Sequence, residues 1–588
     1  MCAFRLLFDM QLSTLDWSII AGFFIVSLII GIITSRKAGS SSAEFFLSGR
    51  NMPWWLLGIS MVATTFSADT PNLVTDIVRK NGVSGNWVWW AFLLTGMLTV
   101  FVYSKLWRRS GVLTDLEFYE IRYGGKSAAF LRGFRALYLG VFFNVMIMAT
   151  VCLAAIKIGG VMLGLSPLQT LAIASVVTVL YSSLGGLRGV IITDFFQFVL
   201  AMIGTIWAAN VLLDLPQVGG LDALLAHKEV ASLTNFLPDF SDTESLIPLL
   251  IIPLAVQWWS VWYPGAEPGG GGYIAQRMLA AKDEQNAMGA TLLFNISHYA
   301  LRPWPWIIIA LCSVVVFPNL ESIQAAFPHI DPSIVNDDLA YPAMLTFLPA
   351  GLLGLVIASL VAAFMSTIST HLNWGSSYVV NDFYQRFVKP DATEKELVMV
   401  GRISTALLML FAALFALALT NALQAFNILM QIGAGTGLIF ILRWFWWRIN
   451  AWTEISGMVI SFVVAIVLEV IATDLVAPNY KLVVGVGITT IGWLLVTFLT
   501  QPESEETLRG FAKHVNPTVG WKNYRSGEVA VAGNLPLQIL GMFLGCVVVY
   551  TALFATGSFI YGNFNAGLML GGVSAFCLIA LARLWRRF

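Results

Sequence analysis

The chain has 588 residues, of which 58% are hydrophobic and 11% are charged, with 33 basic and 33 acidic residues. An ordinary globular protein carries about 25% charged residues, so this composition excludes a set of water-soluble domains. Continuous apolar runs of about 20 residues recur along the chain, which indicates a polytopic α-helical membrane protein in a lipid bilayer and excludes an outer-membrane barrel. The zero net charge gives no general attraction for nucleic acid, and no nucleic-acid partner is expected.

The apolar runs predict fifteen membrane spans and leave no polar stretch long enough for a separate soluble domain. In chain order the predicted spans are 15–34, 54–78, 87–107, 136–163, 168–187, 190–212, 246–264, 287–316, 347–378, 399–421, 424–445, 452–473, 481–500, 535–557 and 564–584.

The basic residues predict the orientation of these spans, because Lys and Arg accumulate in cytoplasmic loops. Arg36 and Lys37 follow the first span and favour an outside N-terminus. With that orientation, 26 of the 33 basic residues, Arg277 among them, fall in inside loops and five fall outside. Lys157 and Arg302 lie at membrane depth. We therefore expect a multi-pass protein of the cell membrane with its C-terminus in the cytoplasm.

Two of the predicted spans are interrupted. The second carries Asp69 and Pro71 after the small, hydroxylated stretch 63–67, and the seventh runs into the sequence PGAEPGGGG at 264–272, which cannot stay helical. The two spans are five apart, and interrupted helices at matching places in two halves are typical of inverted-repeat transporters. The alternative is that proline and glycine merely kink both helices, as is common in membranes.

This spacing predicts a division of the chain into five parts. They are residues 1–53 with the first span and an inside loop, 54–213 with a first five-span repeat, 214–245 as an outside loop, 246–450 with a second repeat, and 451–588 with four further spans and an inside loop near 501–534.

The ninth span carries a stripe of hydroxyl groups. Positions 363, 366, 367 and 370 share one helix face, and three of them are Ser or Thr. Such hydroxyls, together with backbone carbonyls released where a helix is broken, can bind sodium, although they also suit close packing of helices. Asp194 lies inside the sixth span, where a carboxylate needs a partner. The sequence leaves open whether that partner is Arg188 or a cation.

Four segments, in the same order, resemble the sodium:solute symporter family. They are FFLSGRNMPWWLLGISMVATTFSAD at 45–69, YSSLGGLRGVIITDFFQ at 181–197, GGYIAQRMLAAKD at 271–283 and AAFMSTISTHLNWGSSYVVNDFY at 362–384. The resemblance covers about residues 15–450. It implies a LeuT-type fold of two inverted five-helix repeats and coupling of solute uptake to the sodium gradient.

The resemblance also implies the sodium ligands. The main sodium site would be formed by Ala63, Phe66, Ala363, Ser366 and Thr367. A second sodium ion, used by some family members, would be bound by Asp194, Ser366, Ser369 and Thr370.

The solute-binding residues depart from those of the sugar transporters in the family. Thr70 stands where a glutamine is expected after the acidic residue of the broken helix, and tryptophans stand in place of a glutamate in the next span. Tryptophan suits stacking on a sugar ring, whereas Arg302 suits a carboxylate. Both solute classes remain open. The candidate solute residues are Thr70, Trp87, Trp262, Tyr263, His298 and Arg302.

The sequence thus predicts a sodium-coupled symporter that imports a small polar organic solute by alternating access, not an enzyme. Sodium is the expected coupling ion, and no obligate protein partner is indicated. The alternative is a membrane sensor or a channel with a transporter-like fold.

Overall fold

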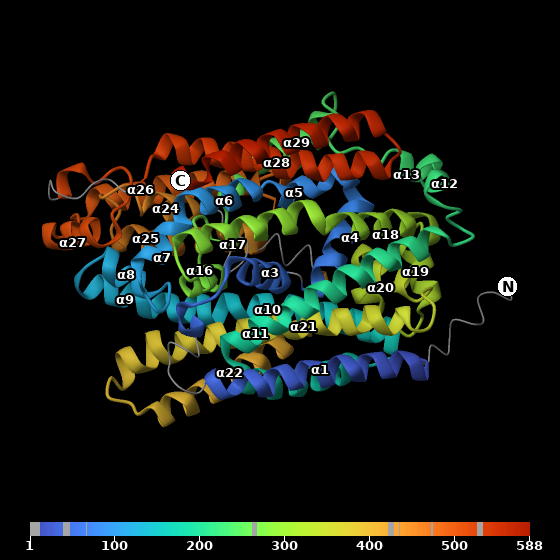
Figure 1. Ribbon diagram of the computed structural model, residues 1–588, viewed down its shortest axis with the longest axis horizontal. Coiled ribbons are helices and arrows are strands. Elements are labelled where there is room, and N and C mark those ends of the chain that lie inside the picture. The colour runs from blue at the N-terminus through green and yellow to red at the C-terminus, as the bar shows by residue number, and fades with distance from the viewer. Residues whose placement is uncertain are drawn as a thin grey trace.

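The computed structural model describes residues 12–38, 47–65, 67–261, 267–421, 429–433, 435–471, 474–525 and 533–588. Across these ranges the chain is built from helices, and the one extended pairing is a short parallel bridge between Met52 and Ala281. Figure 1 shows that most of the longer helices run along the long axis of the molecule, as expected for helices that cross a bilayer side by side.

The helices of the first part of the chain are α1 (Thr14–Ala38), α3 (Trp54–Thr65), α4 (Asp69–Asn81), α5 (Trp87–Trp90), α6 (Leu93–Leu98), α7 (Ser104–Ser110), α8 (Glu117–Arg122), α9 (Gly125–Leu137), α10 (Asn144–Leu163), α11 (Pro167–Leu213), α12 (Leu221–Ala226) and α13 (Lys228–Ala231).

Those of the second part are α14 (Thr243–Leu246), α15 (Ile252–Ala255), α16 (Gly272–Ala280), α17 (Glu284–Ile296), α18 (Pro303–Val316), α19 (Leu320–Ala326), α20 (Ala340–Leu345), α21 (Leu352–Ser377), α22 (Glu394–Ala416), α24 (Gly437–Leu442), α25 (Ala451–Ile466), α26 (Lys481–Leu499), α27 (Glu505–Val515), α28 (Leu535–Ile560) and α29 (Phe564–Leu584).

Fourteen of the fifteen predicted spans coincide with an apolar helical segment. Ten described segments are long and apolar enough to cross a membrane, and four shorter apolar helices, at Thr14–Ser27, Trp54–Thr65, Pro167–Val176 and Thr243–Ala255, fall on other predicted spans. The remaining span, 424–445, is only partly described, with α24 inside it. The number of fifteen crossings therefore stays a prediction.

Two parts of the chain differ in detail from the prediction. The predicted spans 168–187 and 190–212 both lie within α11, which begins at a capping box formed by Ser166 and Gln169 and is 47 residues long, about twice the length that one crossing needs. The seventh predicted span, 246–264, ends in residues outside the described ones. The loop predicted after it contains a further helix, α16, and all of its residues except Gln276 are buried.

The second span is broken as predicted. It consists of α3 and α4, and the chain leaves the helical path between Thr65 and Asp69. The carbonyls in the last turn of α3 therefore lack the amide partners that a continuing helix would supply. α3 packs against α11, α16, α17 and α21, which places this break in the interior of the molecule.

The N-terminal end of α21 is fixed by the first helix. Asp16 of α1 accepts hydrogen bonds from the backbone N–H groups of Gly351 and Gly354, both at 2.7 Å. A carboxylate at this position also interacts favourably with the helix dipole of α21. The close approach requires glycine, because a Cβ atom at Gly354 would lie 2.8 Å from the Asp16 carboxylate.

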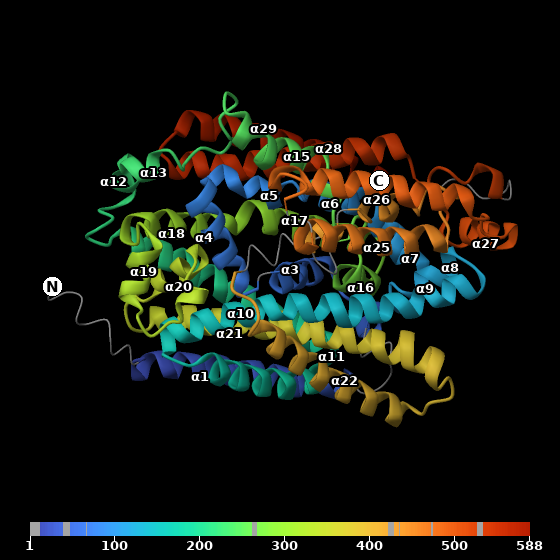
Figure 2. The same cartoon turned by 180° about the vertical axis from the view of Figure 1, so that it is seen from behind.

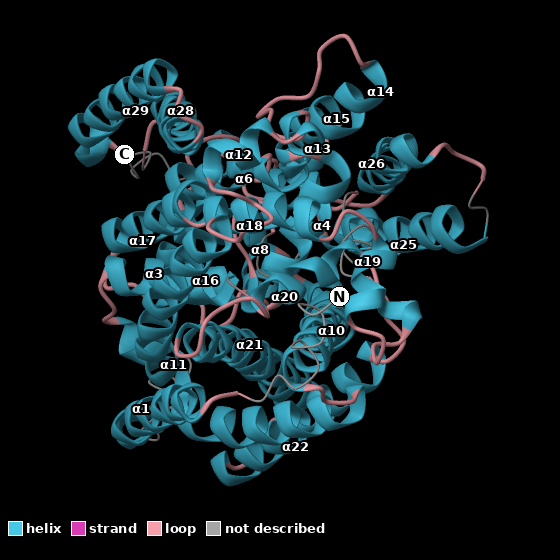
Figure 3. Ribbon diagram, turned by 90° about the vertical axis from the view of Figure 1, so that its right-hand side faces the viewer, coloured by secondary structure: helices cyan, strands magenta, loops and turns pink. Residues whose placement is uncertain are grey.

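Seen along its long axis, the molecule is a broad cluster of helices. Figure 3 shows α21 and α10 toward the middle, with α1 and α22 on one rim and the paired helices α28 and α29 on another. α25 and α26 pack against each other on one side, where Figure 2 shows them side by side. α21, which carries the hydroxyl stripe, is thus in the inner part of the cluster, and α11, which carries Asp194, packs against it.

Candidate functional site

The hydroxyl stripe of α21 faces the broken helix. Thr367 Oγ1 donates a 3.1 Å hydrogen bond to the carbonyl oxygen of Thr64, in the last turn of α3. Ala63, Ala363 and Ser366 are also buried, at no more than 3% exposed. Hydroxyl and carbonyl oxygens from two helices thus meet where α3 ends, and neutral oxygens of this kind suit a hard monovalent cation. Phe66, the remaining predicted ligand, lies outside the described residues.

A second cluster of polar groups surrounds Asp194 of α11. Its two carboxylate oxygens accept 2.6 Å hydrogen bonds from Ser60 of α3 and Ser366 of α21. Asp194 is fully buried. Ser366 therefore links the two predicted sodium sites, because it belongs to the hydroxyl stripe and touches the carboxylate directly.

The basic residue beside Asp194 is Arg277, so the suggested pairing with Arg188 was wrong. Arg277 Nη2 lies 3.8 Å from the carboxylate. The same guanidinium donates to Ser60 at 3.3 Å, to Thr64 at 3.3 Å and to Thr370 at 3.5 Å. Its expected place in an inside loop was also wrong, because Arg277 is fully buried.

Ser369, the remaining residue of the predicted second site, is buried but turned toward its own helix. Its hydroxyl donates to the carbonyl oxygen of Ser366 at 3.1 Å, a back-bond that is common for serine in membrane helices. The structure thus brings Arg277 to Asp194 and Thr370, with Ser366 bonded to the Asp194 carboxylate, while Ser369 satisfies its hydroxyl locally.

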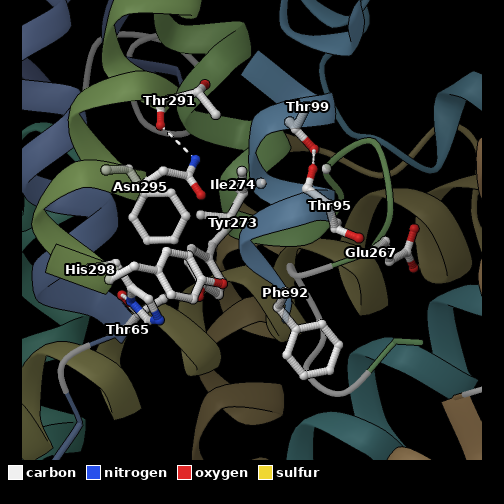
Figure 4. A pocket seen from close by; sticks show the side chains of 14 residues that line it. Thr65, Phe92, Thr95, Thr99, Glu267, Tyr273, Ile274, Thr291, Asn295 and His298 are labelled. Atoms are coloured by element: carbon white, nitrogen blue, oxygen red, sulfur yellow. Dashed lines mark hydrogen bonds between the residues drawn. The ribbon is translucent and has the colours of Figure 1, made fainter. Parts of the chain in front are cut away.

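A cavity of about 40 Å³ lies on the other side of the break in the helix. This volume has room for a few water molecules, so a larger solute fits only where the lining side chains move apart. Its walls come from the end of α3, from α6 and the turn after it, from α16, and from α17 and the turn after it (Figure 4). The residues that line it are Thr65, Phe92, Thr95, Gly96, Thr99, Glu267, Gly270, Tyr273, Ile274, Thr291, Phe294, Asn295, His298 and Tyr299.

The polar groups of this cavity are mostly neutral. Thr99 donates to the carbonyl of Thr95 at 2.9 Å, and Asn295 Nδ2 donates to the carbonyl of Thr291 at 2.8 Å, as the dashed lines in Figure 4 show. These bonds leave the hydroxyl and amide oxygens able to accept further hydrogen bonds. The Asn295 amide lies against Gly96, where any larger side chain would collide with it.

Of the predicted solute residues that the structure describes, only His298 lines the cavity. Its Nδ1 atom lies 3.3 Å from the hydroxyl oxygen of Thr65, and its ring packs against Trp89 and Tyr299. Its Nε2 atom lies 3.3 Å from a guanidinium nitrogen of Arg302. Arg302 itself is buried behind the histidine and stacks on Trp306.

The other solute candidates lie elsewhere. Trp87 donates its indole N–H to the carbonyl of Phe236 at 2.9 Å and packs on Tyr550 of α28. Thr70 lies in the first turn of α4, with its hydroxyl 3.5 Å from the carbonyl of Thr65. Trp262 and Tyr263 lie outside the described residues.

Several residues of the site were missed from the sequence. Thr95 with Thr99, and Thr291 with Asn295, are pairs of polar residues four positions apart in otherwise apolar helices, so each pair shares a helix face. Ser60 and Thr64 form a third pair of the same kind on α3. This spacing was the available signal. Arg277 gave none from hydropathy, because a basic residue after a glycine-rich segment is typical of a loop.

Comparison with known proteins decides the family. The sodium:solute symporter family profile matches residues 45–461. The chain belongs to the sodium:solute symporter family. Among the relatives of this symporter is a sodium/glucose cotransporter of Vibrio parahaemolyticus, 25% identical over 478 residues, which cover 78% of this chain and 86% of the relative. The human sodium/myo-inositol cotransporter 2 is 27% identical, covering 76% of this chain and 69% of the relative.

A solved structure supports the same fold. A Na⁺-coupled sialic acid symporter in a substrate-bound outward-open state superposes with a TM-score of 0.64 at 19% identity, covering 84% of this chain and all of that one. The expected fold class, an all-α polytopic membrane protein of the LeuT type, is confirmed. The protein is a sodium-coupled symporter and not an enzyme, because its relatives are cotransporters. The alternative of a sensor or channel is not favoured.

Proposed function

We propose that this symporter carries a small, neutral, polyhydroxylated solute in the cavity beside the broken helix, driven inward by sodium. The observation that carries the proposal is the lining of the cavity. Threonine hydroxyls, the Asn295 amide and one carboxylate, Glu267, are placed among aromatic rings. Hydroxyl-rich solutes need many donors and acceptors at short range, and aromatic rings pack on their C–H faces.

The position of the charged residues favours such a solute over a carboxylate. Glu267 lines the cavity, whereas Arg302 lies behind His298. A carboxylate in the wall accepts hydrogen bonds from solute hydroxyl groups, whereas a solute carboxylate needs a donor or a positive charge at the wall. The names of the relatives, which include cotransporters for glucose, myo-inositol and mannose, agree with this assignment.

For the main sodium ion we propose the oxygens of Ala63, Phe66, Ala363, Ser366 and Thr367. The hydrogen bond from Thr367 to the carbonyl of Thr64 supports this site, because it brings the hydroxyl stripe to the end of α3. A sodium ion there would join the two helices, so binding it would stabilise one arrangement of the broken helix over the other.

For a second sodium ion we propose Asp194, Ser366, Ser369 and Thr370. The short hydrogen bond between Ser366 and Asp194 supports a shared ligand. Arg277 already provides a positive charge at this carboxylate, so a sodium ion would compete with it. Sodium in the second site therefore requires the guanidinium to move away from Asp194.

We further propose that the symporter lies in the cell membrane with an outside N-terminus and a cytoplasmic C-terminus. The asymmetry of the basic residues supports this orientation. In addition, the start of α1 and the C-terminus lie toward opposite ends of the long axis in Figure 1, as an odd number of crossings requires.

The test of the solute class is uptake into proteoliposomes that contain the purified protein. A panel of neutral sugars, polyols, and amino or carboxylic acids of similar size is offered with an inward sodium gradient and with potassium in its place. We expect sodium-dependent uptake of at least one neutral polyhydroxylated solute. Sodium-dependent uptake of carboxylates alone would refute the assignment.

A further inference from the structure

Two arginines and two glutamates form a closed ring of charges inside the protein. Arg135 of α9 contacts Glu267, and its other nitrogen lies 3.8 Å from Glu454 of α25. Arg443, at the end of α24, lies 3.7 Å from Glu267 and 3.5 Å from Glu454. Each arginine therefore faces both carboxylates, and the four charges sum to zero.

The ring is fully buried, since each of its four side chains is at most 2% exposed. Isolated buried charges are costly, and removing one member of such a ring leaves its partner uncompensated. Helix packing alone does not call for these charges, because replacing a buried ion pair by apolar side chains of similar volume is often neutral or stabilising. A ring of this kind is therefore suited to holding several chain segments in one specific arrangement.

The ring joins parts of the chain that are remote in sequence. Arg135 belongs to the predicted first repeat, Glu267 and Arg443 to the predicted second repeat, and Glu454 to α25 in the C-terminal extension. Glu267 is placed on the unwound segment between α15 and α16. The ring thus fastens the break in the second interrupted helix to three helical elements around it.

The glycine-rich segment is shaped to hold Glu267 in this position. Gly269 and Gly270 have positive φ angles of 86° and 83°, which favour glycine. Trp107 donates its indole N–H to the carbonyl of Gly269 at 2.7 Å. The Glu267 carboxylate folds back over Gly271, where a Cβ atom would lie 2.7 Å from one of its oxygens. This accounts for glycine at positions 269, 270 and 271.

The two carboxylates of the ring differ in one respect. Glu267 also lines the solute cavity, at one edge of the group of side chains in Figure 4. Glu454 instead accepts a 2.6 Å hydrogen bond from the hydroxyl of Tyr123 and is not among the residues of the cavity wall. A carboxylate has about four acceptor positions, so Glu267 can serve the arginines and a solute hydroxyl at the same time.

We propose that Glu267 is a positioning residue that couples occupancy of the solute cavity to the charge ring and, through Arg135, Arg443 and Glu454, to α25. A hydroxyl group that donates to Glu267 weakens its attraction for the two arginines, which then interact more strongly with Glu454. The ring therefore has a different energy with and without solute, and such a difference is what a ligand needs in order to shift a conformational equilibrium. This inference rests on the proposed neutral solute in the cavity.

The test compares two matched substitutions in the full-length protein, Glu267→Gln and Glu454→Gln. Each removes one negative charge from the ring, but only the first alters the cavity wall. We expect Glu267→Gln to raise the KM for the solute about fivefold or more, as the loss of one hydrogen bond to a charged group implies. We expect Glu454→Gln to change the maximal rate while KM stays within about twofold. Equal effects of the two variants on KM would reduce the ring to a structural element and overturn the proposal.

A second measurement does not depend on the solute. Thr99→Cys places a thiol in the cavity wall, and its rate of modification by a small thiol reagent reports access to the cavity. We expect Glu454→Gln to change this rate about threefold or more, although Glu454 is not in the wall. An unchanged rate would overturn the coupling. If the uptake panel shows no sodium-dependent transport of a neutral solute while this modification rate does change, the proposed solute class is refuted and the coupling between the charge ring and the cavity stands.

Either variant could be poorly produced, because it leaves an unpaired buried arginine. The double substitution Arg443→Gln with Glu454→Gln keeps the ring neutral and leaves the pair of Arg135 and Glu267. It is expected to change the modification rate of the Thr99→Cys thiol in the same direction as Glu454→Gln. A double variant that behaves like the parent protein would overturn the proposal.

Discussion

The hydroxyl of Ser366 donates a 2.6 Å hydrogen bond to the Asp194 carboxylate, and both residues are buried. This contact joins the middle of α21 to α11 and makes one serine common to the two proposed sodium sites. It also explains why two sodium ions would bind with mutual dependence. Any ion that takes the Ser366 oxygen removes a hydrogen bond from Asp194, and any ion at Asp194 reorients the serine.

The first prediction concerns the charge of Asp194. Asp194→Asn removes the strongest oxygen ligand of the proposed second site, and a hydrogen bond to a charged group contributes about 1.5–3 kcal/mol. We therefore expect the sodium concentration for half-maximal uptake to rise about 10- to 150-fold. The control is Asp338→Asn, which removes another buried carboxylate, the one that pairs with Lys157 at 2.6 Å. The control is expected to lower the amount of protein without this change in sodium dependence.

The second prediction separates the two hydroxyls of the stripe. Ser366→Ala and Thr367→Ala each remove one proposed ligand of the main sodium ion while keeping a good helix former. Both should raise the half-maximal sodium concentration, by about five- to 150-fold for a loss of 1–3 kcal/mol. Only Ser366→Ala should also reduce the steepness of the sodium dependence, because only Ser366 serves both sites.

A matched control for these variants is Ser359→Ala. Ser359 is a buried serine of the same helix, and its hydroxyl donates to the carbonyl of Val356 at 2.8 Å. The control should show the sodium dependence of the parent protein. If all three variants keep that dependence, the stripe serves helix packing, because alanine packs as closely as serine.

The third prediction concerns the solute cavity. Gly96→Ala inserts a methyl group against the Asn295 amide, which lines the cavity. We expect a rise of about tenfold or more in the KM for the solute, since a displaced amide loses its place in the hydrogen-bonding wall. The sodium dependence should not change. Gly571→Ala on α29 is the control, because a Cβ atom there would meet nothing within 4 Å. A normal KM for Gly96→Ala would place the solute elsewhere.

The fold class was predictable because a membrane span appears in the sequence as an apolar run of about 20 residues. Such runs predicted fourteen segments that the structure shows as apolar helices. The break between Thr65 and Asp69 was also predictable, since small and hydroxylated residues next to a proline disfavour a continuous helix. The sequence placed a break between the predicted spans 168–187 and 190–212, whereas residues 188 and 189 are helical within α11.

The arrangement around Asp194 was only half predictable. Motifs identified the carboxylate and the hydroxyls, which lie on two long helices whose faces follow from their periodicity. Arg277 could not be placed, because its position depends on how the unwound segment 267–271 turns back into the protein. Hydropathy treats a glycine-rich segment with a basic residue as exposed, whereas the structure buries it between α3, α7 and α17.

The fourth prediction concerns the orientation in the membrane. A reporter enzyme that works only in the cytoplasm should be active when it is fused after Phe588, because the basic residues place the C-terminal end inside. The same enzyme fused after Tyr561, between α28 and α29, should be inactive, because this loop is predicted to lie outside. The pair of fusions tests the direction of α29 directly. A C-terminal fusion active only outside would contradict the fifteen-span topology.

The last prediction concerns Arg277, whose guanidinium lies 3.8 Å from the Asp194 carboxylate and contacts Ser60, Thr64 and Thr370. Two unit charges about 4 Å apart interact by about 4 kcal/mol at the effective dielectric constant of a protein surface, so this arginine opposes a sodium ion at the same carboxylate. Arg277→Gln should therefore lower the half-maximal sodium concentration, and it should also lower the maximal rate, because a more tightly held ion is released more slowly. Arg277→Lys keeps the charge and should restore a sodium affinity close to that of the parent. A purely structural arginine gives the opposite result, in which Arg277→Gln weakens both sodium binding and protein stability. In that case Arg277→Lys restores neither property, because lysine lacks the planar fork of donors.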